Sequence, residues 1–151
     1  MTLVATVTQH IGDAMRQRDQ ASLGPLRMLK AALMNREVEK GRALDDAESL
    51  QVVQQLVKQR RDSIEQFRAG GRPELADKEQ AEITFLERYL PPAADPAAVA
   101  AAIDAAISAV GATSMKDMGK VIKAVTTALA GVTVDGKSVA EAVKARLAPP
   151  A

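Results

Sequence analysis

The sequence predicts an all-helical protein, with a unit of about four helices followed by a smaller unit of three. The composition is rich in helix-forming residues, with 29 alanines among 151 residues. The only strand-like run, VTV at residues 132–134, is too short to build a sheet. Capping residues and glycines divide the remainder into segments of helical length.

Four helices are expected in the first 90 residues. Ser22 is the expected cap of the second helix, Asp45 or Asp46 caps the third, and Pro73 opens the fourth. Apolar residues three, four or seven positions apart give the third helix one buried stripe, formed by Leu50, Val53, Val57, Ile64 and Phe67. The expected helical ranges are about 2–17, 22–40, 45–69 and 73–90.

The sequence YLPPAADP at residues 89–96 marks the clearest internal boundary, because two consecutive prolines cannot continue a helix. The alanine content rises at the same place, from 10 in residues 1–90 to 19 in residues 91–151. Three further helices are expected after the caps Asp95, Ser114 and Asp135. We therefore predict a first domain over 1–90, a Pro-rich linker over 91–95 and a second domain over 96–148. One continuous bundle with a proline loop is the alternative.

The composition excludes several classes of function. Without cysteine, the chain has no disulfide, thiolate metal site or cysteine nucleophile. The net charge of +1 argues against a strongly basic nucleic-acid coat, and an aromatic content of 2% argues against base stacking on rings. The sequence shows neither a signal peptide nor a long apolar run. We expect a cytoplasmic protein with no membrane partner and no DNA partner.

No motif for catalysis, metal binding or cofactor binding is present, so the chain is not expected to be an enzyme by itself. The carboxylates at 62 and 65 follow the basic residues at 58 and 61 by four positions, a spacing typical of a helix surface. The single histidine, His10, has no partner fixed by sequence and is expected to be structural.

The strongest candidate for a binding site is the segment 111–131. On a helical wheel, its apolar residues fall on one face, which is expected to pack in the core: Met115, Met118, Ile122, Val125 and Leu129. Lys116, Lys120 and Lys123 fall on nearly the opposite face. Gly119 allows close approach of another backbone or a phosphate, and Ser114 is expected to cap an anion-friendly helix end. A plain solvated face is the alternative interpretation of the lysines.

Several motifs spread over the chain resemble the signature of the GatB/YqeY family. The sequence GATSMKDMGKV at 111–121 is followed by DGK at 135–137. RMLKAA at 27–32, KQRRDSIE at 58–65 and YLP at 89–91 also fit. The similarity covers essentially the whole chain, and it implies a small, stand-alone YqeY-like protein.

The resemblance implies a function in translation. YqeY-like proteins are similar to the helical tail of the B subunit of the glutamine-dependent tRNA amidotransferase, a carbon–nitrogen ligase, and that tail is implied to contact tRNA. Lys116, Lys120 and Lys137 match motif positions, whereas Val132 stands where the family has a basic residue. The expected partners are tRNA, bound weakly, and an aminoacyl-tRNA synthetase or amidotransferase subunit. A helical adaptor that binds another protein of translation or metabolism is the alternative.

Overall fold

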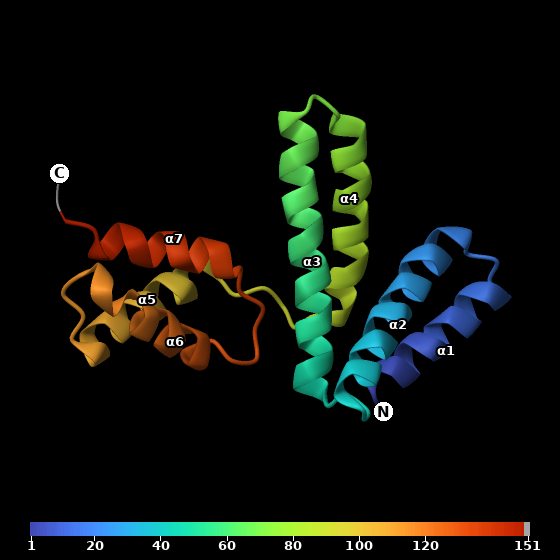
Figure 1. Cartoon of the computed structure of the whole chain (residues 1–151), viewed down its shortest axis with the longest axis horizontal. Helices are drawn as coiled ribbons and strands as arrows, with labels where there is room; N and C mark the ends of the chain where they lie inside the picture. Colours follow the sequence, from blue (N-terminus) through green and yellow to red (C-terminus); the bar gives the residue numbers. More distant parts are fainter. Residues whose placement is uncertain (150–151) are drawn as a thin grey trace. The chain divides into compact units, whose positions relative to one another are not determined.

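The computed structural model describes residues 1–149, and the all-helical class is confirmed for that part of the chain (Figure 1). It divides into two compact units, Met1–Leu90 and Pro91–Ala151. The first contains α1 (Leu3–Arg16), α2 (Gln20–Lys40), α3 (Asp46–Ala69), α4 (Pro73–Leu86) and the 3₁₀ turn η1 (Glu87–Tyr89). The second contains α5 (Pro96–Val110), the 3₁₀ turn η2 (Met115–Asp117), α6 (Met118–Ala128) and α7 (Gly136–Leu147).

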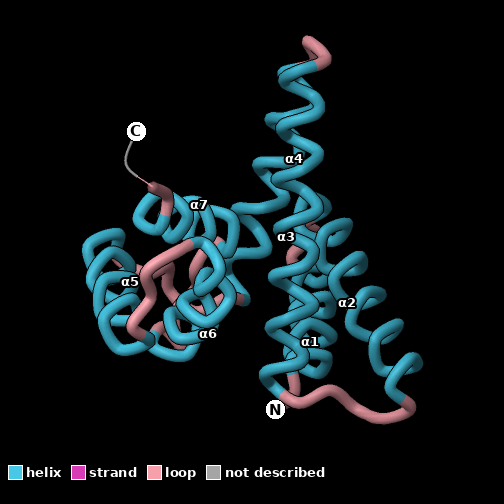
Figure 2. The backbone as a smooth tube through the Cα atoms, turned by 60° about the vertical axis from the view of Figure 1, so that its left-hand side comes forward, coloured by secondary structure: helices cyan, strands magenta, loops and turns pink. Residues whose placement is uncertain are grey.

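The first unit is built from two helical hairpins. Helices α1 and α2 form one, α3 and α4 form the other, and the connected ends of α3 and α4 extend beyond the α1–α2 pair (Figures 1 and 2). The shared core contains side chains with no exposed surface from α1, α2, α3 and α4, namely Val7, Leu29, Leu33, Val53 and Leu86. The fourth helix is shorter than predicted, since α4 ends at Leu86 and η1 follows.

The start of α2 differs from the sequence prediction. The cap is Asp19, whose Oδ1 accepts a hydrogen bond from the Ser22 backbone N–H at 3.2 Å. Its Oδ2 accepts another from the Ser22 hydroxyl at 2.6 Å. Ser22 therefore lies inside the first turn as a donor, and the prediction that it caps the helix is wrong. Asp45, in contrast, caps α3 in a complete capping box with Glu48.

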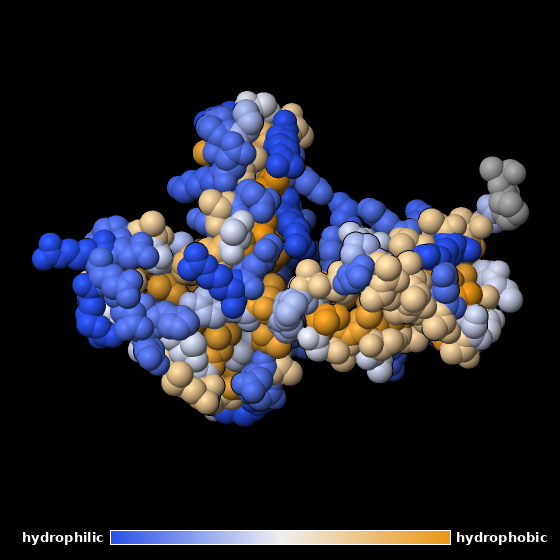
Figure 3. Space-filling model, turned by 180° about the vertical axis from the view of Figure 1, so that it is seen from behind, coloured by the Kyte–Doolittle hydropathy of each residue, from blue (hydrophilic) through white to orange (hydrophobic). Residues whose placement is uncertain are grey.

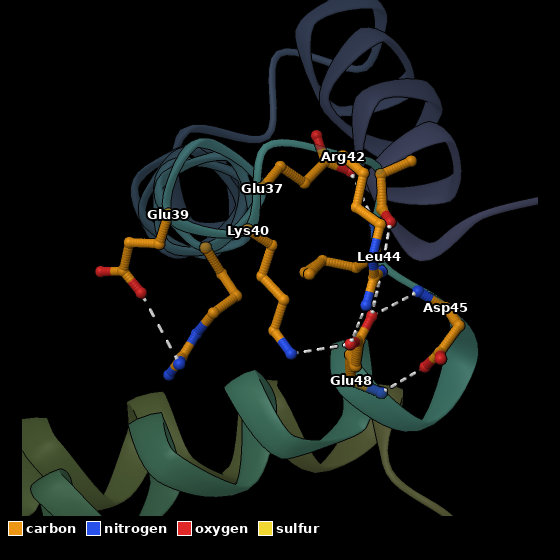
Figure 4. A network of polar contacts seen from close by, with 9 residues as sticks. Glu37, Glu39, Lys40, Arg42, Leu44, Asp45 and Glu48 are labelled. Atoms are coloured by element: carbon orange, nitrogen blue, oxygen red, sulfur yellow. Dashed lines mark hydrogen bonds and ion pairs between the residues drawn. The ribbon is translucent and has the colours of Figure 1, made fainter.

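Glu48 also holds the turn between α2 and α3 (Figure 4). Its carboxylate accepts hydrogen bonds from Lys40 Nζ at 2.8 Å and from both terminal nitrogens of Arg42 at 2.7 and 2.8 Å. The Asp45 backbone N–H donates a further bond at 3.0 Å. These hydrogen bonds hold the pKa of Glu48 far below its ordinary range. The bond from Arg42 lowers this pKa most, followed by those from Lys40 and the Asp45 N–H.

This network predicts an acid-sensitive contribution to the stability of the first unit. Because the pKa of Glu48 is lower in the folded state than its ordinary value of 4.5, the ionised carboxylate stabilises the fold above pH 4.5. That contribution is lost as the pH falls below 4.5 towards the folded pKa. We expect Glu48→Gln to be less stable than the wild type in urea at pH 7, with a smaller difference at pH 3. An equal difference at both pH values would contradict the assignment.

The second unit packs three short helices around one core. Four side chains in this core have no exposed surface: Ile103 of α5, Val121 and Val125 of α6, and Val143 of α7. Outward-facing alanines cover much of α5, and Figure 3 shows one face of this unit as largely apolar, whereas the visible surface of the first unit is mostly hydrophilic. All six basic residues of the second unit lie on η2, α6 and α7.

Residues 91–94, expected to form part of a linker, are hydrogen-bonded within the second unit. The Thr133 hydroxyl donates to the Pro91 carbonyl at 2.6 Å, and the Thr133 N–H donates to the Pro92 carbonyl at 2.9 Å. The Ala94 N–H in turn donates to the Thr133 carbonyl at 2.8 Å. Asp95 then caps α5, with Pro96 at its first position as predicted.

Candidate nucleic-acid interface

Three lysines lie together on the helical segment formed by η2 and α6, and we call them the lysine face: Lys116, Lys120 and Lys123. All three side chains are exposed. Within residues 1–149, none of them forms an ion pair with another side chain. The segment is anchored from its other side by Val121 and Val125, which have no exposed surface. The three charges are therefore available to a partner, while the core holds the helix in place.

The buried side of this segment is rotated relative to the predicted wheel. Val121 and Val125 form its centre, whereas Met118, Ile122 and Leu129 are half-buried and Met115 is 38% exposed. The expectation that Met115 belongs to the core is wrong. The reason is that Met115 lies in a 3₁₀ turn, which has three residues per turn, so a wheel drawn at 3.6 residues per turn misplaces it.

Ser114 and Asp117 cap the start of the segment as a pair. The Asp117 carboxylate accepts hydrogen bonds from the Thr113 and Ser114 N–H groups at 3.0 and 3.4 Å, and these two bonds lower the pKa of Asp117. The Ser114 hydroxyl accepts from the Lys116 N–H at 3.4 Å. The N–H groups of Asp117 and Met118 also have acceptors in the chain. The helix start therefore has acceptors of its own for the N–H groups of five residues, Thr113, Ser114, Lys116, Asp117 and Met118, which leaves less for an anion than expected.

The remaining predicted site residues lie at separate positions. Gly119 is the second residue of α6, is exposed, and has open space where a side chain would be. Lys137 is exposed in the first turn of α7, where the Asp135 carboxylate accepts a hydrogen bond from its N–H at 3.2 Å. Val132, at the position where the family has a basic residue, is 37% exposed in the loop between α6 and α7.

A groove in the first unit was not predicted from the sequence. It has a volume of about 410 Å³ and is lined by residues of α1, the start of α2, α4 and η1. His10 and Tyr89 meet there, with 2.7 Å between His10 Nδ1 and the Tyr89 hydroxyl oxygen. The Arg88 guanidinium lies 4.9 Å from the centre of the Phe85 ring. His10 thus ties η1 to α1, as a structural residue with a partner 79 positions away.

The groove gives a direct spectroscopic prediction, because Tyr89 is the only tyrosine in the chain. Burial raises the pKa of Tyr89, and the charge of Arg88 lowers it by less. Titration of the native protein, followed by ultraviolet absorbance, should show ionisation centred above pH 10.0. In denaturant the midpoint should return to about 10. A native midpoint below the denatured one would show that the ring is not buried as described.

Arg60 is a second residue whose environment was not predicted. It is only 8% exposed on α3, and its Nε donates to Glu82 Oε2 of α4 at 2.9 Å. Its terminal nitrogens contact the Leu56 carbonyl and the sulfur of Met28. The sequence does contain a signal for this burial, since Arg60 lies three positions after Val57 and four before Ile64, within the apolar stripe of the helix.

Among residues 1–149, no group of three or more histidine, aspartate or glutamate side chains is arranged to hold a metal ion. No single helix in this part of the chain has the length and apolar content needed to span a membrane. One pair of segments would meet that requirement together by length and composition alone, namely Pro96–Val110 and Met115–Ala128. The chain bends by 104° between them.

These features define a two-unit helical protein whose second unit presents exposed lysines on one helical segment. The chain belongs to the family of YqeY-like proteins, whose family model matches residues 4–147. The resemblance inferred from the motifs is thereby confirmed.

Curated relatives are mitochondrial proteins of yeasts. The altered inheritance of mitochondria protein 41 of Lachancea thermotolerans is 32% identical over 88 residues, covering 58% of this chain and 47% of the relative. The protein of the same name from Eremothecium gossypii is also 32% identical over 88 residues, covering 58% and 48%. That of Saccharomyces cerevisiae strain YJM789 is 32% identical over 78 residues, covering 51% and 42%. The match thus spans about half the length of each relative.

Proposed function

We propose that this YqeY-like protein is an accessory module that binds tRNA through the lysine face and catalyses no reaction of its own. The observation that carries the proposal is the arrangement of Lys116, Lys120 and Lys123. All three are exposed and form no ion pair within the described residues, on a helix whose opposite side is buried through Val121 and Val125. Ammonium groups in such a row suit the phosphates of a nucleic acid backbone.

The chemistry of the face favours a folded RNA. It has no aromatic side chain on which an unpaired base could stack, so recognition rests on phosphate positions and shape. With so few charges, the affinity should be modest, with a dissociation constant of about 10⁻⁴–10⁻⁶ M at physiological salt. A protein partner, either a synthetase or an amidotransferase subunit, remains a prediction. A cytoplasmic location also remains a prediction, and the relatives are named as mitochondrial.

One observation in the first unit favours the second candidate, an adaptor that binds another protein. Met34 and Val38 lie one helical turn apart on α2, and they are 47% and 81% exposed. Exposed apolar side chains at this spacing are typical of a helix that contacts a partner through a groove. This function would depend on the first unit and leave the lysine face unused.

Binding of unfractionated tRNA by the full chain separates the two candidates. The triple variant Lys116→Ala, Lys120→Ala, Lys123→Ala should weaken binding by about tenfold or more, because three phosphate contacts are lost. Its thermal stability should change by no more than about 0.5 kcal/mol per site, since the lysines are exposed. The matched control removes three exposed cations of the first unit, at Lys58, Arg68 and Lys78.

The control variant has the same net charge as the lysine variant, so a general charge effect would weaken both equally. Loss of binding only in the lysine variant supports the proposal. The proposal is overturned, and the adaptor favoured, by either of two results. One is that the wild-type protein does not bind tRNA, and the other is that a folded lysine variant binds as well as the wild type.

A further inference from the structure

Gly119 has no role in the fold that another residue could not fill. It lies in the continuous helical stretch formed by η2 and α6, and its φ is not in the left-handed region, which among the glycines holds only Gly41, Gly71, Gly111 and Gly131. A Cβ placed on it would meet no atom within 4 Å. Neither backbone geometry nor packing therefore requires glycine, although glycine weakens a helix relative to alanine.

The position of Gly119 on the lysine face is specific. Residues three and four apart are neighbours on a helix surface. Lys116 precedes Gly119 by three positions and Lys123 follows it by four, so both flank it. Met115, four positions before, is a further neighbour of Gly119 and is also exposed. Because Gly119 is exposed and has no side chain, the helix backbone is accessible at this position between Lys116 and Lys123.

We infer that Gly119 is the close-approach point of this surface, where a phosphodiester of bound RNA lies against the α6 backbone between Lys116 and Lys123. This inference rests on the proposed function and specifies its geometry. A side chain at position 119 would keep the RNA backbone away from the helix. The attraction between a phosphate and both ammonium groups would then weaken, because Coulomb energy falls with distance.

The inference predicts that Gly119→Ala improves folding and impairs binding. Alanine favours the helix, so the melting temperature of the second unit should rise by about 2–8 °C. Affinity for tRNA should fall by about tenfold, as measured by equilibrium titration. Since all three lysines remain, the slope of log affinity against log salt should stay within about one unit of the wild-type value.

Gly24 provides a matched control. It lies within α2, is exposed, has no positive φ, and a Cβ there would also meet nothing within 4 Å. Gly24→Ala should therefore leave tRNA affinity unchanged, and because Gly24 precedes Pro25 its gain in helix stability should be smaller than that of Gly119→Ala. Because both variants add the same methyl group, a difference in binding between them reports on position and not on glycine content.

The outcomes distinguish this inference from the proposed function. Weaker binding by Gly119→Ala together with a raised melting temperature supports the close approach. If Gly119→Ala is more stable and binds tRNA like the wild type, the close approach is wrong, while the lysine face stands on its own triple variant. If the lysine variant also binds like the wild type, or if the wild type does not bind, both are wrong.

Discussion

Replacing Leu29 with alanine should lower the free energy of unfolding of the first unit by about 2–5 kcal/mol. Leu29 lies on α2 and has no exposed surface, like Leu33 one turn later and Leu86 of α4. Truncation removes buried methyl groups and leaves a cavity that close-packed neighbours fill only in part. Because domains are stable by only about 5–15 kcal/mol, the loss should be plain in urea denaturation followed by circular dichroism.

Met34 offers a control on the same helix. It is 47% exposed, so Met34→Ala should cost about 0.5 kcal/mol or less. Equal losses of stability for Leu29→Ala and Met34→Ala would show that α2 packs against the core through a different face.

The second large effect is expected at Arg60. Arg60→Ala should destabilise the first unit by about 3 kcal/mol, at the lower end of the range for breaking a buried ion pair. The lower end applies because the Glu82 side chain keeps 27% of its surface exposed, so its carboxylate reaches water when Arg60 is removed. The loss also includes the packing of the long arginine stem among α2, α3 and α4.

A double substitution separates the charge from the packing. Arg60→Met combined with Glu82→Leu replaces both charges with apolar side chains, so neither partner is left unpaired. Such replacements are often neutral or stabilising. We expect the double variant to unfold within about 1 kcal/mol of the wild type. A loss as large as that of Arg60→Ala would show that the ion pair itself stabilises the fold.

The helices were predictable because their signals are local. The Asp95–Pro96 start, the Asp45 cap and the glycines after α2 and α5 act within one turn of the chain. The start of α2 was missed because Asp19 and Ser22 are both good caps, and only the folded backbone selects between them. The 3₁₀ turn at Met115 was missed because a wheel assumes one helical period throughout.

In the candidate site, too, features set by local sequence were predictable and contacts between distant residues were not. The exposure of Lys116, Lys120 and Lys123 follows from their spacing against the apolar residues of one helix, so the sequence sufficed. The contact between His10 and Tyr89 joins residues 79 positions apart and carries no local pattern. The burial of Arg60 was not predicted, although its register matches the buried stripe of α3.

The salt dependence of tRNA binding tests the central claim most directly. Each lysine that contacts a phosphate adds about 0.7–0.9 to the magnitude of the slope of log affinity against log salt. The variant lacking Lys116, Lys120 and Lys123 should therefore show a slope about two to three units shallower than the wild type, while the Lys58, Arg68 and Lys78 control keeps the wild-type slope. Equal slopes for the wild type and the folded lysine variant would contradict the account.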